Sequence, residues 1–399
     1  MLAFRLGGLA AMVLLAGCST PIVHRATPPA TASPAPSITP APSATPSSTP
    51  TTVALTAGSV HPESITFISP DVGWVLGISG CGDSSCLRLA RTADAGRAWT
   101  WVTSTGLSAL STVTQWRVRF ADSENGWISG PLLFATHDAG STWTRVAFPG
   151  EGSSGASVDA LETAGGRVYA EIAEGTEPNT DGPVVLFESP TNRDSWQPVS
   201  GVTTGTAGYA GEISVAQGVF WATLHSAVVT AEGNTQSSTL YRSLNGVTWR
   251  TEPQPCQSGW GATVAAATSA RVFIVCSGGG AAGSQEKMAY VSHNDGASYQ
   301  LVADPPLGGD FEAVAASPTG ISVAAASGAT YIYASFDGGA AWTTAYGIGD
   351  GGLGLSDLDF TTATQGVVIH GQTNDPQSLQ LLMTRDGGHQ WETVAVNPT

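Results

Sequence analysis

The feature that most constrains this chain is a short turn motif that recurs between residues 92 and 391 at nearly constant spacing. A clear copy, Thr136-His-Asp138-Ala-Gly140-Ser-Thr-Trp143, places a hydroxyl residue, an Asp, a Gly and a closing Trp at fixed offsets. The seven closing aromatic residues follow one another at intervals of 44, 53, 53, 50, 43 and 49 residues. Such a period is the size of one four-stranded β-propeller blade, which buries its faces only against its neighbours.

The copies keep the motif to different degrees. Four keep the Asp, the Gly and the Trp: Asp94, Gly96 and Trp99; Asp138, Gly140 and Trp143; Asp337, Gly339 and Trp342; and Asp386, Gly388 and Trp391. One softened copy has Asn294, Gly296 and Tyr299, a shorter one has Asn245 and Trp249, and residues 189–196 keep only the ends, Ser189 and Trp196.

The motif has a local explanation. An Asp carboxylate can accept backbone N–H bonds across a tight turn, and Gly supplies an angle that other residues resist. The aromatic ring then packs over the turn. We therefore predict a structural role for these residues, without calcium binding or catalysis.

A second repeated element precedes each turn motif. It consists of an apolar strand, a polar turn and a second strand, as in Ile65-Thr-Phe67 followed by Gly73-Trp74-Val75. Seven such pairs match seven turn motifs, and no window shows the period of an amphipathic helix. The sequence therefore predicts an all-β fold, a seven-bladed β-propeller of four-stranded antiparallel blades over residues 53–399. Residues 53–62 are expected to close the ring against the last blade.

These motifs resemble the Asp-box, or bacterial neuraminidase repeat, of the sialidase-like propellers. A sialidase needs three arginines on the substrate carboxylate, a Tyr nucleophile with its Glu, and an Asp acid/base. Only Arg117 and Arg119 lie on a strand expected to approach the channel, and the family's N-terminal Arg-Ile-Pro-like segment is missing. We therefore predict no sialidase activity and assign no catalytic residue.

The N-terminus has the pattern of a secretory signal. Arg5 precedes an apolar run from Leu6 to Leu15, which is too short to span a bilayer. Residues 15–18, Leu-Ala-Gly-Cys, resemble the lipobox of bacterial lipoproteins, which implies cleavage after residue 17 and lipidation of Cys18. More than one acyl chain is needed for stable anchoring. The resemblance implies a protein anchored in the cell membrane by lipid, on the extracytoplasmic side.

A low-complexity segment follows the lipobox. From Ala26 to Thr52 every residue except Ile38 is Ala, Thr, Pro or Ser. Such a composition buries no apolar area, and it predicts a disordered tether with polyproline II bias that reaches on the order of 90 Å. We therefore divide the chain into a signal peptide (1–17), a lipidated Cys with its tether (18–52) and the propeller (53–399).

Four cysteines remain after Cys18. An even number in an exported protein favours disulfides, and we predict the pairs Cys81–Cys86 and Cys256–Cys276. The first would close a hairpin and the second would connect adjacent blades. Because histidines are scattered and no Cys-x-x-Cys occurs, the sequence indicates no metal site, and we expect no cofactor.

Charge and loop composition bear on the partner. A formal net charge of −16 disfavours nucleic acid. The loops expected at the channel mouth carry acids, among them Asp83, Glu151, Glu174, Glu177, Asp181, Glu232, Asp310, Glu312 and Asp350. The candidate ligand face adds Arg117, Arg119, Tyr209, Trp260, Phe311 and Tyr346. Acids with aromatics suit a carbohydrate or a peptide, and they also suit a solvated rim.

Repeats without a catalytic set favour a non-catalytic binding or scaffold module for an unknown protein or glycan, which we expect to be a monomer. The alternative is a glycoside hydrolase or lyase of another Asp-box family that uses acids at the channel mouth. The repeat is also similar to that of the plastid and cyanobacterial photosystem II assembly factor. The basic patch of that family is not evident here, and a shared fold does not transfer function.

Overall fold

A computed structural model describes residues 58–399 except 83, 150–155, 175–181, 231–232 and 282. The chain divides into two units, Met1–Thr52 and Val53–Thr399, and every described residue belongs to the second. The predicted signal peptide, Cys18 and the tether lie outside the described residues. No helix in the described part of the chain is long and apolar enough to cross a membrane.

The described unit consists almost entirely of antiparallel strands in chain order. Five sheets have four strands each: β1 (His61–Phe67), β2 (Gly73–Cys81), β3 (Ser84–Thr92) and β4 (Thr100–Val102); β5 (Arg117–Phe120), β6 (Gly126–Ser129), β7 (Leu133–Thr136) and β8 (Thr144–Val146); β16 (Gly261–Ala266), β17 (Val272–Ala281), β18 (Ser284–Ser292) and β19 (Gln300–Leu301); β20 (Asp310–Ala316), β21 (Ile321–Ala326), β22 (Gly328–Ser335) and β23 (Thr343–Gly351); β24 (Leu355–Phe360), β25 (Gly366–Gln372), β26 (Asp375–Thr384) and β27 (Glu392–Val394). A single short 3₁₀ helix, η1 (Leu107–Ala109), is present among the described residues.

The remaining sheet differs from the sequence prediction of separate four-stranded units. It contains seven strands, β9 (Ala156–Ala164), β10 (Arg167–Glu174), β11 (Pro183–Pro190), β12 (Gln197–Ala216), β13 (Val219–Thr230), β14 (Gly233–Ser243) and β15 (Trp249–Glu252). The long strand β12 pairs with β11 up to Ala207 and with β13 from Gly208 onward. Because the backbone stays extended between the two pairings, no loop divides this sheet.

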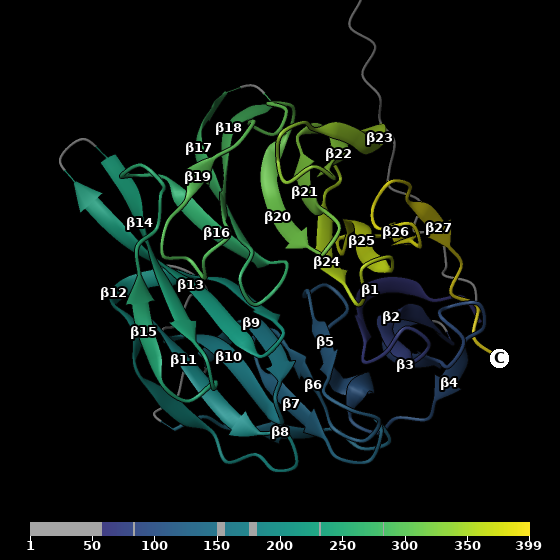
Figure 1. Cartoon of the computed structure of the whole chain (residues 1–399). Coiled ribbons are helices and arrows are strands. Elements are labelled where there is room, and N and C mark those ends of the chain that lie inside the picture. Colours follow the sequence, from purple (N-terminus) through teal and green to yellow (C-terminus); the bar gives the residue numbers. More distant parts are fainter. Residues whose placement is uncertain (1–57, 83, 150–155, 175–181, 231–232, 282) are drawn as a thin grey trace, which may run out of the picture. The chain divides into compact units, whose positions relative to one another are not determined.

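The sheets surround a common centre, with inner strands such as β1, β5, β9, β20 and β24 near it (Figure 1). Apolar side chains fill the space between neighbouring sheets, and one cluster joins the first sheet to the last through Trp74, Val367 and Leu381. The ring closes where the segment before β1 meets the segment after β27: the Val60 N–H donates to the Val396 carbonyl at 3.2 Å. The expected closure is thus seen for the described part of residues 53–62.

The acidic and amide residues of the turn motifs form the local bonds that the sequence predicts. Asp94 Oδ1 accepts hydrogen bonds from the Thr92 hydroxyl at 2.9 Å and from the Ala98 N–H at 2.8 Å. Equivalent pairs of bonds occur at Asp138, Asn294, Asp337 and Asp386, and Asn245 makes similar bonds in its shorter turn. The polar side chains that define the motif therefore form hydrogen bonds within the turn itself.

The motif glycines also take the predicted structural role. Gly96 has a φ of 79°, in the left-handed region that glycine adopts readily, and its N–H donates to the Thr92 hydroxyl at 2.9 Å. The same positive φ and the same N–H bond to the motif's own Ser or Thr occur at Gly140, Gly296, Gly339 and Gly388. At Gly339 a Cβ atom would lie 2.5 Å from Val302, so the site has no room for a side chain.

The closing aromatics are packed to different depths, and contact with the Gly of the ring's own turn is seen at Trp99, Trp249 and Tyr299. Trp99, Trp143, Trp196 and Trp391 are buried in the apolar clusters between sheets. Trp249, Tyr299 and Trp342 are only partly buried, each at the edge of a cluster. Their polar ends explain part of the difference: Trp249 Nε1 donates to the Gly246 carbonyl at 3.1 Å and Trp342 Nε1 to the Ala303 carbonyl at 2.7 Å.

Both predicted disulfides are present. Cys81 and Cys86 close the β2–β3 hairpin with a Cα–Cα distance of 6.0 Å. Cys256 follows β15 and bonds to Cys276 of β17, with a Cα–Cα distance of 5.4 Å. The second bond therefore attaches the segment after the seven-stranded sheet to the next sheet.

Candidate functional site

The innermost strands carry β-bulges that place acidic residues around the channel. In β1, β9, β12, β20 and β24 the register slips by one residue, at Glu63, Asp159, Gly211–Glu212, Glu312 and Asp357–Leu358. A bulge leaves one residue without a partner in the ladder and turns its side chain. β5 and β16 pair without a bulge. The bulges thus follow the innermost strands of the ring and mark where a charged side chain leaves its sheet.

Several of these acids join neighbouring sheets. Glu63 Oε1 accepts the Trp116 N–H at 2.6 Å, and Glu312 Oε2 accepts the Leu355 N–H at 2.8 Å. Asp357 accepts the Ile65 N–H at 3.0 Å and also bonds the Ser64 hydroxyl. Each of these acids lies at a bulge and accepts a main-chain N–H in the next sheet's inner strand or directly beside it. A buried N–H needs such a partner, so these carboxyls are structural.

Other junctions use the same device with different side chains. Glu171 Oε2 accepts the Gly211 N–H at 2.8 Å, the Ser214 hydroxyl accepts the Ala266 N–H at 2.9 Å, and Gln285 Oε1 accepts the Phe311 N–H at 2.6 Å. Polar residues near the channel therefore serve first to hold the ring together.

Burial shifts the pKa values of the joining acids. It raises the pKa of Glu63 to about 8 and that of Glu312 to about 7, because the charged form loses its hydration. Burial alone would also raise the pKa of Asp357, but Arg119 and Arg117 outweigh it and hold that pKa below its ordinary value. Asp357 is therefore the ionised member of this group, Glu63 is mostly protonated at neutral pH, and Glu312 is about half protonated there.

Arg119 is fully engaged in the channel wall. Its Nη2 lies 3.1 Å from Asp357 Oδ1, its Nε lies 3.9 Å from Glu162 Oε2, and its Nη1 donates to the Ile65 carbonyl at 3.3 Å. Burial raises the pKa of Glu162 to about 7 although Arg119 opposes the shift. Arg119 thus has few donors left for a ligand.

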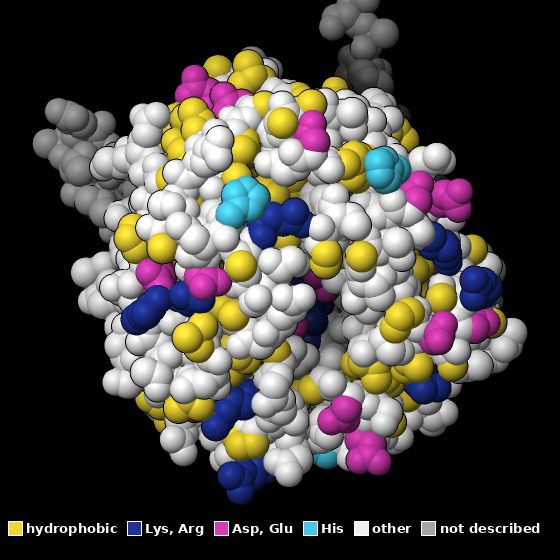
Figure 2. All heavy atoms as spheres, viewed as in Figure 1, with side chains coloured by type: hydrophobic (Ala, Val, Ile, Leu, Met, Phe, Trp, Pro, Cys, Tyr) yellow, Lys and Arg dark blue, Asp and Glu magenta, His cyan; other side chains and the backbone are white. Residues whose placement is uncertain are grey.

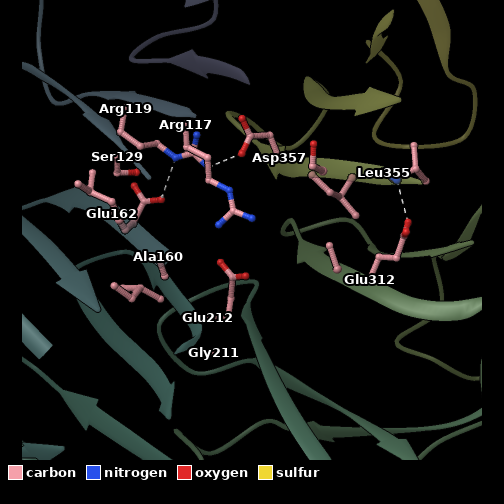
Figure 3. Close-up of a pocket in the computed structure, with 15 residues that line it drawn as sticks. Arg117, Arg119, Ser129, Ala160, Glu162, Gly211, Glu212, Glu312, Leu355 and Asp357 are labelled. Carbon is pink, nitrogen blue, oxygen red and sulfur yellow. Dashed lines mark hydrogen bonds and ion pairs between the residues drawn. The ribbon is translucent and has the colours of Figure 1, made fainter. Parts of the chain in front are cut away.

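Arg117 and Glu212 differ from the residues around them. Arg117 Nη1 donates to the Asp159 carbonyl, and no ion pair joins Arg117 to an acid in the described part of the chain. Burial raises the pKa of Glu212 to about 8, and no described residue donates a hydrogen bond to its carboxyl. Figure 3 shows the Arg117 guanidinium and the Glu212 carboxyl directed toward one another, with no hydrogen bond or ion pair between them.

The two side chains border a series of cavities. A central cavity of about 120 Å³ is lined by Arg117, Arg119, Glu162, Glu212 and Asp357, among others. Two wider cavities, of about 330 and 490 Å³, adjoin the strand starts and both include Gln115 and Arg117. Figure 2 shows one face of the molecule hollowed at its centre, with charged side chains inside. Arg117 is shared by all three cavities and is therefore the best placed cation for a ligand.

The wider mouth cavity of 490 Å³ has a polar lining. It includes the amide side chains of Gln115, Gln372 and Asn374 and the hydroxyl residue Thr373, together with the exposed Val113. The three amide groups receive and donate no hydrogen bond within the described residues. Each amide can donate and accept, which suits a ligand rich in hydroxyl or amide groups.

The predicted ligand-face residues separate into two groups. Arg117 and Arg119 lie in the channel, as expected. Tyr209 stacks on His225 with centroids 4.8 Å apart, Tyr346 meets His370 edge-on at 6.1 Å, Trp260 packs over Gly278, and Phe311 packs in an apolar cluster. None of these four aromatics lines the cavities described above, and the structure therefore does not gather them with the arginines.

The predicted mouth acids are also divided. Asp83, Glu151, Glu177, Asp181 and Glu232, and the side chain of Glu174, lie outside the described residues. Asp310 is exposed, Glu312 joins two sheets, and Asp350 bonds Thr330 and His370, the latter at 2.6 Å. Asp350 is therefore part of a buried junction and not a solvated rim. Among the described residues, no group of three His, Cys, Asp or Glu side chains could hold a metal ion.

Comparison with known proteins defines the class of fold. No family model and no curated protein matches this chain. Two structures of YCF48 are similar: one bound to a D1 peptide (TM-score 0.52, 19% identity, 84% of this chain and 95% of that chain) and one from Cyanidioschyzon merolae (0.52, 16%, 84% and 97%). An ancestral GH74 enzyme is also similar (0.53, 12%, 86% of this chain), although the chain spans only 47% of that enzyme. This chain is a β-propeller. At such identities the likeness shows the fold alone, so its function has to be inferred from its own residues.

Proposed function

We propose that this protein is a non-catalytic glycan-binding module, presented outside the cell on a lipidated tether, whose ligand enters the mouth of the channel. The proposal depends on a difference between two sets of polar side chains in the channel. Most charged groups hold adjacent sheets together, whereas Arg117 and the amides of Gln115, Gln372 and Asn374 have hydrogen-bonding capacity to spare around adjoining cavities. Polar and charged side chains outnumber apolar ones in the lining of the mouth, which favours a hydroxylated ligand over an apolar peptide.

The propeller is proposed to have seven blades. The seven-stranded sheet is divided where β12 changes partner, between Ala207 and Gly208. Each half then has four strands and its own turn motif, as in the other five sheets. The Asp-box assignment of the motifs belongs to the same proposal, and the bonds at Asp94 and its counterparts support it.

A glycan array probed with the mature protein tests the function. Binding to a defined set of glycans, weakened by Gln372→Ala and Asn374→Ala in the mouth, is expected. The control is Gln380→Ala, an exposed amide on β26 that does not line these cavities. Binding that survives both mouth changes, or no binding to any glycan, contradicts the proposal.

One observation favours a second candidate, a glycoside hydrolase or lyase. Glu162 and Glu212 line the central cavity, and burial raises their pKa values to about 7 and about 8, the range in which a carboxyl serves as a general acid. Hydrolysis of a polysaccharide panel that disappears in Glu212→Gln, with folding retained, would establish this alternative.

The membrane anchor is proposed from the lipobox alone. Cys18→Ala, or inhibition of the lipoprotein signal peptidase, is expected to leave an uncleaved precursor or to release the protein from the membrane. Fractionation and mass measurement of the N-terminal peptide test it. A mature, membrane-bound protein with an unmodified Cys18 contradicts the anchor.

A further inference from the structure

We propose that the central cavity binds the carboxylate of an acidic sugar, held between the Arg117 guanidinium and the Glu212 carboxyl. This inference rests on the proposed glycan-binding function and specifies its ligand class. It starts from two polar groups that face one another in a cavity. The two groups point at one another across a cavity of about 120 Å³ and form no bond (Figure 3). A group placed between them would bond both.

The surroundings leave these two residues available. Arg119 is held by Asp357 and Glu162. Glu63 accepts the backbone N–H of Trp116, just before β5, and Glu312 accepts that of Leu355 in β24. Arg117 spends one donor on the Asp159 carbonyl. A guanidinium has five N–H donors in a planar fork that matches a carboxylate, so most of the N–H donors of Arg117 remain available for a ligand.

Glu212 supplies the complementary donor. Burial raises its pKa to about 8, so it is mostly protonated at neutral pH and its O–H can donate to an anion. The titratable and charged groups that face this cavity or border it come from every wall element: Glu63 of β1, Arg117 and Arg119 of β5, Asp159 and Glu162 of β9, Glu212 of β12, Glu312 of β20, and Asp357 and Asp359 of β24. A ligand carboxylate would thus meet one cation that no ion pair holds and one acid that is mostly protonated at neutral pH.

The space available sets the size of the bound group. A cavity of about 120 Å³ has the room of roughly four waters, which suits a carboxylate and excludes a sugar ring. The adjoining cavity of about 330 Å³ shares Arg117, Ser129 and Gly211 with the central one. A ring could occupy this outer space and direct its carboxylate inward. A uronate has this shape, with a charged group at one edge of a hydroxylated ring.

The test compares D-glucuronate with D-glucose on the mature protein by titration calorimetry near neutral pH. Glucuronate is expected to bind at least tenfold more tightly than glucose. Arg117→Met should weaken glucuronate binding about ten- to hundredfold, because it removes a charge-assisted bidentate contact. The control Arg97→Met changes an exposed arginine of a turn motif and should bind as wild type. Melting temperatures verify that the variants are folded.

The role of Glu212 is tested by pH. Wild-type binding should fall as pH rises through about 8, because ionised Glu212 repels the ligand carboxylate. Glu212→Gln keeps a donor that does not ionise, so its binding should fall less than that of wild type as pH rises through about 8. Glu162 and Glu312, whose pKa values burial raises to about 7, ionise in both proteins and do not account for this difference. Parallel pH curves for the two proteins overturn the role of Glu212.

The outcomes separate this inference from the proposed function. Equal affinity for glucuronate and glucose, or full glucuronate affinity in a folded Arg117→Met variant, overturns the carboxylate site while array binding can still stand. Binding of a glutamate-containing peptide in place of glucuronate also overturns the acidic-sugar assignment. No detectable binding of glucuronate overturns the inference, and the array alone then decides the function.

Discussion

Asp357 is the residue whose replacement tests most directly how the ring is held closed. It occupies a bulge in β24 at a φ of 54°, with its side chain 3% exposed. Its carboxylate bonds the Ser64 hydroxyl and the Ile65 N–H of the first sheet and pairs with Arg119 at 3.1 Å. One side chain of the last sheet therefore joins the first sheet to the second.

The magnitude follows from these contacts. Asp357→Ala removes both carboxylate acceptors, leaves the Ile65 N–H buried without a partner, and leaves Arg119 with only the longer contact to Glu162 at 3.9 Å as an ion pair. Breaking a buried ion pair in this way costs about 3–5 kcal/mol. Ala also adopts a positive φ less readily, which adds on the order of 1 kcal/mol. Asp357→Asn keeps the shape, one carbonyl acceptor and tolerance of this φ, so it should cost about half as much.

Urea unfolding at neutral pH and at a series of lower pH values measures the effect. The pKa of Asp357 is depressed in the folded protein, so its contribution is present above the ordinary value of about 3.9. The contribution is lost as pH falls through the folded pKa, and the difference between wild type and Asp357→Asn should shrink there. The control Asp375→Asn changes an exposed acid of β26 in the same sheet and should leave the free energy of unfolding unchanged. Wild-type stability in Asp357→Ala, or a gap that persists at low pH, would falsify this account of closure.

Three further perturbations have defined outcomes. Trp391→Ala should lower the free energy of unfolding in urea by about 3–5 kcal/mol, because Trp391 is only 8% exposed. Asp386→Ala should lower it by only about 1 kcal/mol, because the Gln390 N–H that it releases can reach water. A larger loss for Asp386→Ala than for Trp391→Ala contradicts this ranking. The contribution of Glu63 to stability should fall as pH rises from about 4.5 toward 8, because burial raises its pKa to about 8 and the folded state holds a proton that the unfolded state has released. Glu63→Gln should reduce the slope of unfolding free energy against pH by up to about 1.4 kcal/mol per pH unit. An unchanged slope refutes this role of Glu63. Cys256→Ser should lower stability by about 3 kcal/mol because the bond to Cys276 closes a loop with a sequence separation of 20 residues, measured by melting with and without reductant; equal melting temperatures would show that the bond contributes nothing.

Local chemistry explains which parts of the fold the sequence predicts. The turn motifs carry their own bonds, as between Thr92 and Asp94, so their position marks the end of one strand and the start of the next. The disulfide pairs follow from hairpin and neighbour geometry. The seven-stranded sheet is not predicted because β12 contains several glycines typical of a loop, such as Gly201 and Gly205 at positive φ, yet the strand continues through them.

Non-local pairing explains what the sequence does not reveal about the site. Arg117 and Arg119 could be placed in the channel because alternate residues of one inner strand face the same side. Glu212 and Asp357 could not, because a bulge reverses that alternation and depends on the partner strand. The nearest signal is an acid within an otherwise apolar first strand of a repeat. Tyr209 is expected from the sequence at a ligand face, but its ring is stacked on His225 of the same sheet.

The channel also shows how buried acids should be interpreted in a propeller. Raised pKa values at Glu63, Glu312 and Glu212 are alike in direction and cause, so they do not distinguish structure from function. The bonding partner does. Glu63 and Glu312 each accept a main-chain N–H of the next sheet or the segment leading into it, and their burial is the consequence of closing the ring. Glu212 lies at the same kind of bulge without such a bond, and the Arg117 guanidinium faces it across the central cavity. Burying the Glu212 carboxyl costs free energy, and no main-chain bond to a neighbouring sheet compensates for it. This is why Glu212, and not Glu63 or Glu312, is the acid that we propose to contact the ligand.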